Sequence, residues 1–220
     1  MVIAVDDFEL AFIAVPNTAG TAVQSMLTQL AGTKPTTDDD GPSNRARHWP
    51  RFREDRFNAY QGFFRFTLIR DPIQRLLSVY TELVQDREDL PLSLRVGGQH
   101  DVPMCPDPDF FFQNLTAYMG AVPIIKQHAM KQVVFTGTQL DRYDRVYRAR
   151  ELRLLRDDLT AMTGRSVTFT RPNRSKATFD LCDLAPATQA AIRSHTEADY
   201  AAMSQWFRPP WNAEKLLSAV

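Results

Sequence analysis

The sequence predicts an α/β fold in which helices flank a central, mostly parallel sheet of about four or five strands. An apolar run, a short turn and an amphipathic helix follow one another over residues 9–30, and the same succession recurs over residues 63–84. Repeated strand–turn–helix units are typical of parallel sheets with flanking helices. The length of 220 residues suits one α/β domain, so we expect a single domain over residues 1–220.

The first unit contains a loop suited to an anion. Residues 10–15 are an apolar run of strand length, and a turn of small and hydroxylated residues follows at 16–21. A helix is expected next, because apolar residues recur at helical spacing at Val23, Met26, Leu27 and Leu30. A strand, a tight glycine-containing loop and a helix N-terminus present backbone N–H groups to phosphate or sulfate. Gly20 would allow close approach, and Thr18 and Thr21 would add hydroxyl donors.

The second unit joins a strand to a helix through Arg70, Asp71 and Pro72. Residues 63–69 are rich in aromatic and β-branched side chains, which favours a strand. Pro72 suits the first turn of a helix, where its missing N–H costs nothing. The remaining chain is expected to form short strands at 133–135, 145–147 and 167–170, and helices at 110–119, 152–162 and from 186 to about 208.

Composition excludes several classes of function. The 26 cationic and 26 acidic residues balance, so net charge gives no argument for a nucleic-acid partner. The N-terminus lacks the basic start and apolar core of a signal peptide, and no apolar run approaches the ~18–20 residues of a membrane span. We therefore expect a cytoplasmic protein. The four His and two Cys show no metal-ligand spacing, so no metal is expected.

Two motifs resemble the sulfotransferase superfamily, and more narrowly its carbohydrate-type, family 2-like members. The first family motif reads P-K-T-A-G-T-S, and residues 16–22 read P-N-T-A-G-T-A. The second, R-D-P-x-x-R-x-x-S-x-Y, is matched in full by residues 70–80. Weaker matches to two further family patterns, H-x-x-x-Q and N-x-S, follow at residues 128–132 and 173–175. The motifs occur in the family's order and span most of the chain.

This resemblance implies a P-loop-like three-layer α/β/α domain that uses 3′-phosphoadenosine-5′-phosphosulfate (PAPS) as a sulfuryl donor and needs no metal. Arg70 and Ser78 would hold the 3′-phosphate, and Ser175 and Lys176 are further donor-binding candidates. The loop that would hold the 5′-phosphosulfate comprises Pro16, Asn17, Thr18, Ala19, Gly20, Thr21 and Ala22. The alternative for Arg70 is a salt bridge with Asp71 or another acid, and the alternative for Ser78 is an incidental hydroxyl on a helix face.

Asn17 stands where the family has its catalytic lysine. In sulfuryl transfer, negative charge builds on the leaving phosphate oxygen, and a neutral amide is worth roughly half a charged donor. Loss of one charge-stabilising donor typically costs about 10²–10³ in rate. One hypothesis is therefore an active sulfotransferase for a hydroxyl acceptor, expected to be a carbohydrate, in which another cation replaces the lysine. Candidates for that cation are Arg45, Arg47 and Lys176. The other is a catalytically impaired PAPS-binding module.

An acceptor hydroxyl also needs a general base. Related enzymes use a His or Glu after the first helix, so His48 is the first candidate and His128 the second; the alternative is a surface or packing role for each. His48 lies in the Arg-rich segment 45–56. This segment could be part of a wall for an anionic substrate, and the alternative is a solvated amphipathic helix or turn. Segment 86–109 is expected to be a lid or acceptor loop. A P-loop kinase is disfavoured because GxxxxGK[ST] is absent.

Overall fold

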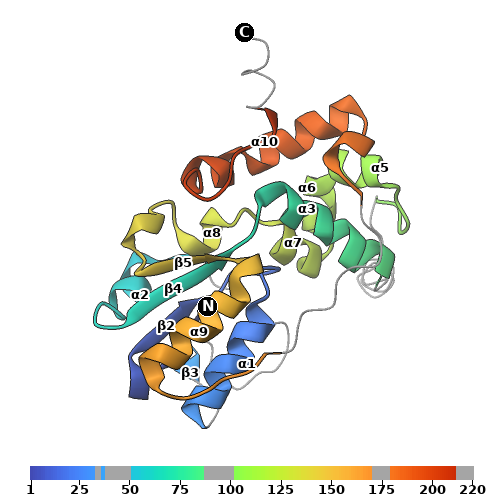
Figure 1. Cartoon of the computed structure of the whole chain (residues 1–220). Helices are drawn as coiled ribbons and strands as arrows, with labels where there is room; N and C mark the ends of the chain where they lie inside the picture. Colours follow the sequence, from blue (N-terminus) through green and yellow to red (C-terminus); the bar gives the residue numbers. More distant parts are fainter. Residues whose placement is uncertain (33–35, 38–50, 87–101, 170–178, 212–220) are drawn as a thin grey trace.

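A single mixed sheet forms the centre of the computed structural model, which describes residues 1–32, 36–37, 51–86, 102–169 and 179–211. Within these ranges, five strands are ordered β3-β1-β2-β4-β5 (Figure 1). Their bounds are β1 Val2–Val5, β2 Leu10–Ile13, β3 Thr36–Thr37, β4 Phe64–Ile69 and β5 Arg145–Arg148. The expected strands at residues 10–15, 63–69 and 145–147 correspond to β2, β4 and β5.

The strand directions confirm the predicted α/β class with a mostly parallel sheet. β2 pairs with β4 in parallel, and β4 pairs with β5 in parallel. β1 runs against its neighbours β2 and β3. The link from β1 to β2 is a short 3-10 turn, η1 Asp6–Phe8, that ends at Glu9 with a left-handed φ of 50°. Such a short connection can join only antiparallel strands, so β1 and β2 form a hairpin.

Helices cover the two faces of the sheet. On one face, α1 Gly20–Ala31 and α9 Leu152–Thr163 pack against alternate strand residues such as Phe12 and Phe66, whose rings stack with centroids 5.3 Å apart. On the other face, Ala11 and Ile13 contact Phe57 of α2 Glu54–Asn58. The alternation of Ala11, Phe12 and Ile13 between the faces follows from the two-residue period of a strand.

A second layer of helices surrounds α3 Pro72–Tyr80, which continues as a π-helix over Thr81–Asp86. They are α5 Pro108–Gln113, α6 Leu115–Ala121, α7 Pro123–Ala129, α8 Val133–Thr136 and α10 Pro186–Ala202. Apart from α8, these helices share one apolar core with α3, and α10 contacts both α3 and α5 (Figure 1). Short 3-10 helices complete the described chain at η3 Leu140–Arg142, η4 Ala149–Glu151 and η5 Leu181–Asp183.

The expected strand at residues 133–135 is wrong, because these residues form helix α8. The carboxylate of Asp199 in α10 accepts the backbone N–H groups of Gln132 and Val133 at 2.9 and 3.0 Å, which caps the start of this helix. Gly137, at φ 72°, ends it. A distant carboxylate therefore overrides the local strand preference of two valines and a phenylalanine.

Three other predicted elements differ from the structure. The helix expected from 186 to about 208 ends at Ala202. Residues 167–169 are not a strand; instead, the side chain of Gln29 accepts from the N–H of Thr168 at 3.0 Å and donates to its carbonyl at 2.8 Å. The expected helix at 110–119 is interrupted at Asn114, whose φ of −109° separates α5 from α6.

The segment expected to be a lid or acceptor loop, 86–109, is described only at its ends. Residue 86 closes the π-helix, and residues 87–101 lie outside the described ranges. Residues 103 and 106 are fixed to the helical layer, because the Tyr118 hydroxyl donates to the Pro103 carbonyl at 3.0 Å and the Tyr80 hydroxyl to the Pro106 carbonyl at 2.9 Å. Across the described helices, none combines the length and apolar character needed to cross a bilayer.

Candidate functional site

The loop between β2 and α1 is shaped by two non-glycine residues in the left-handed region. Asn17 has a φ of 63° and Ala19 a φ of 66°, while Gly20 begins α1. Such conformations cost of order 1 kcal/mol each and cluster at functional sites. Ala19 is the N-cap residue and offers no side-chain hydrogen bond to the helix. The first backbone N–H groups of α1, at Gly20 and Thr21, thus lack a side-chain cap and suit an anion.

The remaining residues of the loop support its shape. The Thr18 side chain is fully buried, and its hydroxyl donates to the Val15 carbonyl at 2.9 Å. Its proton is therefore engaged within the loop, which differs from the expectation that it donates to an anion. Thr21 is exposed, whereas Pro16 and Ala22 are buried and Ala22 packs in the core under α1.

The two sequence motifs meet at the hydroxyl of Ser78. Ser78 Oγ accepts from Asn17 Nδ2 at 2.7 Å and from Arg70 Nη1 at 3.0 Å. It donates to the Arg75 carbonyl at 2.8 Å. We call Asn17, Arg70 and Ser78 the Ser78 cluster. Its members lie together because β2 and β4 are neighbouring parallel strands, whose carboxyl ends reach the same edge of the sheet.

Arg70 has one weak ionic contact in the described structure. Its Nη1 lies 3.9 Å from Oε1 of Glu82, so the salt bridge anticipated as an alternative exists in a long form. Asp71 has a different role: it accepts from the backbone N–H of Gln74 and caps α3, and it accepts from the Tyr200 hydroxyl at 3.0 Å. Burial lowers the pKa of the Arg70 guanidinium, and the charges of Glu82 and Asp71 oppose that shift. An arginine remains a cation here.

Arg75 lies behind the loop and is 2 % exposed. Its Nε donates to the Pro16 carbonyl at 2.9 Å and its Nη1 to the Met130 carbonyl at 2.8 Å. Nη2 is buried and, within the described residues, has no hydrogen-bond partner. Burial lowers the pKa of Arg75 to about 10, so the group is charged at neutral pH. Arg75 thus fixes the loop to the end of α7 and adds a buried positive charge beside the site.

Gln132 fixes the backbone of Arg70. Its side-chain oxygen accepts from the Arg70 N–H at 3.0 Å, and its amide nitrogen donates to the Arg70 carbonyl at 2.8 Å. Gln132 is fully buried and its own N–H is held by Asp199. Sequence reasoning did not propose Gln132, Arg75 or Asp199 as site residues. Gln132 and Arg75 could have been found, because they occupy the Q of H-x-x-x-Q and the second R of R-D-P-x-x-R. Asp199 stands in neither motif.

The predicted bases and cations are placed only in part. His128 lies in α7 and is half-buried. The other candidates fall outside the described ranges: Arg45, Arg47, His48, Ser175 and Lys176. His195 contacts the Ala129 carbonyl through Nε2 at 2.8 Å. In the part of the chain that the structure describes, His, Cys, Asp and Glu form no group of three that could hold a metal.

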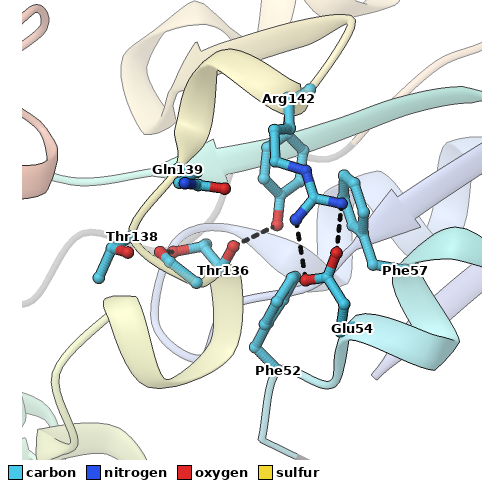
Figure 2. Close-up of a pocket in the computed structure, with 9 residues that line it drawn as sticks. Phe52, Glu54, Phe57, Thr136, Thr138, Gln139 and Arg142 are labelled. Atoms are coloured by element: carbon cyan, nitrogen blue, oxygen red, sulfur yellow. Dashed lines mark hydrogen bonds and ion pairs between the residues drawn. The ribbon is translucent and has the colours of Figure 1, made fainter.

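Two pockets lie apart from the Ser78 cluster. One, of about 250 Å³, lies between α2 and the loop that follows α8 (Figure 2). The other, of about 430 Å³, lies along β5 and has Arg145 and Arg148 beside acidic residues. Neither is lined by Asn17, Arg70 or Ser78. The anion site is therefore identified by its charged groups and free helix N-terminus rather than by the volume of a cavity.

Comparison with known proteins assigns the chain at the level of a family. The family model described as the sulfotransferase family matches residues 1–202. Searches of curated proteins and of solved structures gave no match. The family match covers β1 through α10, including both motifs of the Ser78 cluster. The chain therefore belongs to the sulfotransferase family.

Proposed function

We propose that this protein transfers a sulfuryl group from PAPS to a hydroxyl acceptor, with a carbohydrate as the expected class. The observation that carries the proposal is the convergence of Asn17, Arg70 and Ser78 next to the uncapped N-terminus of α1. Family membership supports a sulfuryl donor. Together, a cation, hydroxyl and amide donors and a helix dipole suit a ligand with two separate anionic groups.

The residues fit such a donor with one adjustment. The free N–H groups at the start of α1 would hold the 5′-phosphosulfate, and Arg70 would pair with the 3′-phosphate. Ser78 now donates its proton to the Arg75 carbonyl, so its hydroxyl would have to rotate to donate to the phosphate. This rotation costs little, because the Arg75 carbonyl lies inside α3 and also accepts a helical N–H.

The proposed reaction is an in-line displacement at sulfur. The acceptor oxygen forms a bond to sulfur, the bond from sulfur to the 5′-phosphate oxygen breaks, and its electron pair leaves with adenosine 3′,5′-bisphosphate (PAP). The acceptor loses its proton to a base, for which His48 and His128 are the candidates. The protein's contribution would be positioning and stabilisation of the negative charge on the leaving phosphate.

Asn17 supports a second candidate function, a PAPS-binding protein with impaired catalysis. Its amide nitrogen is directed to Ser78 Oγ at 2.7 Å and lies 3.4 Å from the Arg75 carbonyl. Both contacts are with α3, so in this arrangement the amide serves the proposed 3′-phosphate side of the site. A donor that is neutral and already engaged would stabilise a leaving group poorly.

Ligand-dependent thermal unfolding tests the donor assignment. PAPS and PAP at 100 times their dissociation constants should stabilise the protein by about 2.7 kcal/mol, whereas ATP, which lacks the 3′-phosphate, should stabilise it less. Absence of stabilisation by PAP would overturn the proposal. Arg70→Ala should weaken PAP more than ATP, and an equal loss for both would exclude the role given to Arg70.

Comparison of Asn17→Lys with the wild type separates the two candidate functions. PAPS hydrolysis and transfer to a mixture of glycans would be followed by release of PAP. A gain of about 10²-fold or more in the lysine variant, over a nearly inactive wild type, indicates impaired catalysis in the natural protein. Activity of the wild type that falls in the variant indicates a site adapted to asparagine.

A further inference from the structure

An acidic side chain, Glu82, lies next to the cation of the Ser78 cluster. Its Oε1 is 3.9 Å from Arg70 Nη1, the same nitrogen that donates to Ser78 Oγ at 3.0 Å. Glu82 follows Ser78 by one helical turn, in the π-helix that continues α3. Its carboxylate therefore lies beside the atoms to which we assign the 3′-phosphate, and it carries a charge of the same sign as that ligand.

The backbone at Glu82 is fixed by the helical layer around α3. Leu83 and Val84, which follow Glu82, are buried in the apolar core that α3 shares with its neighbouring helices. On the other side, the Thr81 hydroxyl donates to the Ser78 carbonyl at 3.3 Å. A π-helical turn is a frequent feature of functional sites. Movement of Glu82 relative to Arg70 is therefore confined to its side chain.

The ion pair between Arg70 and Glu82 contributes little to the fold. Its length of 3.9 Å exceeds that of a hydrogen bond, and the two side chains are 31 % and 26 % exposed. Partly exposed pairs of this length add little to the free energy of unfolding, because water competes for both charges. The same exposure leaves the guanidinium accessible to a ligand. The pair therefore bears on anion binding more than on stability.

Glu82 also sets the charge that an anion meets at this site. Burial lowers the pKa of the Arg70 guanidinium, and Glu82 opposes that shift more than Asp71 does. The Asp71 carboxylate already caps α3 and accepts from the Tyr200 hydroxyl. A phosphate monoester carries about −1.5 to −2 charges at pH 7. Such a ligand would meet a partly neutralised cation, with a like charge beside it.

We propose that Glu82 limits the affinity of the site for the 3′-phosphate, because its carboxylate competes for Arg70 and repels the bound anion. In the ligand-free protein, Arg70 is shared between Ser78 and Glu82. A phosphate oxygen would replace Glu82 at the guanidinium, and the carboxylate would rotate toward solvent. This exchange weakens the binding of PAP as well as PAPS, so Glu82 favours release of the product. The inference rests on the proposed function for the identity of the ligand.

Calorimetric titration of the wild type and Glu82→Gln with PAP tests this role. Glutamine keeps the length of the side chain and removes its charge, so PAP should bind the variant about tenfold more tightly or better. Adenosine 5′-phosphate, which is PAP without its 3′-phosphate, should gain less than about twofold. The control is Glu54→Gln, which removes a carboxylate paired with Arg142 outside the cluster and should leave the PAP affinity unchanged.

Inorganic phosphate probes the same contact without a nucleotide. Its affinity is measured from the rise in the thermal unfolding midpoint with phosphate concentration. Glu82→Gln should bind phosphate about fivefold more tightly than the wild type. This gain should require the guanidinium, so the double variant Arg70→Ala/Glu82→Gln should bind phosphate no better than the wild type. Without ligand, the unfolding midpoint of Glu82→Gln should stay near that of the wild type.

The outcomes separate this inference from the proposed function. Equal phosphate affinity of the wild type and Glu82→Gln, or a gain that persists in the double variant, would overturn the role of Glu82. Weaker PAP binding by Glu82→Gln would also overturn it, because the carboxylate would then be accepting a hydroxyl of the ligand. Tighter phosphate binding that requires Arg70, without PAP binding in either protein, would support Glu82 and refute the donor assignment. PAP binding of equal strength in both proteins would do the reverse.

Discussion

Replacement of Gln132 by Met tests how firmly the backbone of Arg70 is held. Methionine is similar in length and apolar, so Gln132→Met removes the hydrogen bonds of 3.0 and 2.8 Å without leaving a large cavity. The Arg70 N–H and carbonyl would lose these partners in a region where Gln132 is fully buried. Each unsatisfied buried group costs about 1–3 kcal/mol, so we expect a loss of about 2–6 kcal/mol in the free energy of unfolding.

Urea denaturation of the wild type, Gln132→Met and the control Gln205→Met measures this loss. The control is exposed and should stay within about 0.5 kcal/mol of the wild type. The PAP affinity of Gln132→Met should also fall, because the guanidinium of Arg70 would no longer be positioned. A loss under about 1 kcal/mol would refute the energetic reasoning. Unchanged PAP affinity would show that Gln132 stabilises the fold without positioning Arg70.

Three further predictions concern the supports of the site. Tyr200→Phe removes the hydroxyl that contacts both oxygens of Asp71 at 3.1 and 3.0 Å. Urea denaturation should show a free energy of unfolding lower by about 1.5–3 kcal/mol. An unchanged free energy of unfolding would mean that water replaces the hydroxyl. Arg75→Lys keeps the charge but cannot reach both backbone carbonyls, so calorimetry should show weaker PAP binding together with lower stability, whereas full PAP affinity would contradict its role behind the loop. Burial lowers the pKa of His195 below the usual 6.5, so on acidification the unfolded chain takes up a proton at His195 before the folded chain does. The free energy of unfolding should therefore fall as pH drops below about 6.5. His195→Gln should flatten this pH dependence, and an unchanged dependence in the variant would exclude His195 as its source.

The parts of the fold that sequence could predict are those with local signals. The strand–turn–helix units at β2–α1 and β4–α3 show apolar periodicity within a few turns of chain, and both are present. The predicted strand at residues 133–135 was wrong because Asp199, far along the chain, caps α8. The predicted strand at residues 167–169 was wrong for a similar reason, since the side chain of Gln29 bonds the backbone N–H and carbonyl of Thr168. Such contacts depend on the packed fold and leave no local pattern.

The candidate site divides in the same way. Asn17, Arg70 and Ser78 stand in recognisable motifs, and the structure brings them together. The direction of the Asn17 amide toward Ser78 could not be predicted, because its partner lies on α3, 61 residues further along the chain. The pocket between α2 and the loop that follows α8 likewise has no sequence signal, since its walls come from segments about 80 residues apart that meet only in the folded chain.

The single proton of Ser78 limits how the site can receive a ligand. A hydroxyl has one proton and two lone pairs, and in Ser78 the proton goes to Arg75 while Asn17 and Arg70 occupy the acceptor side. A phosphate oxygen can accept from Ser78 only in exchange for the Arg75 carbonyl, whereas Arg70 has further N–H groups to offer it. The gain in hydrogen-bond enthalpy at Ser78 is correspondingly small, but the side chains are already immobilised, so little conformational entropy remains to be lost. Such preorganisation favours binding governed by charge and shape.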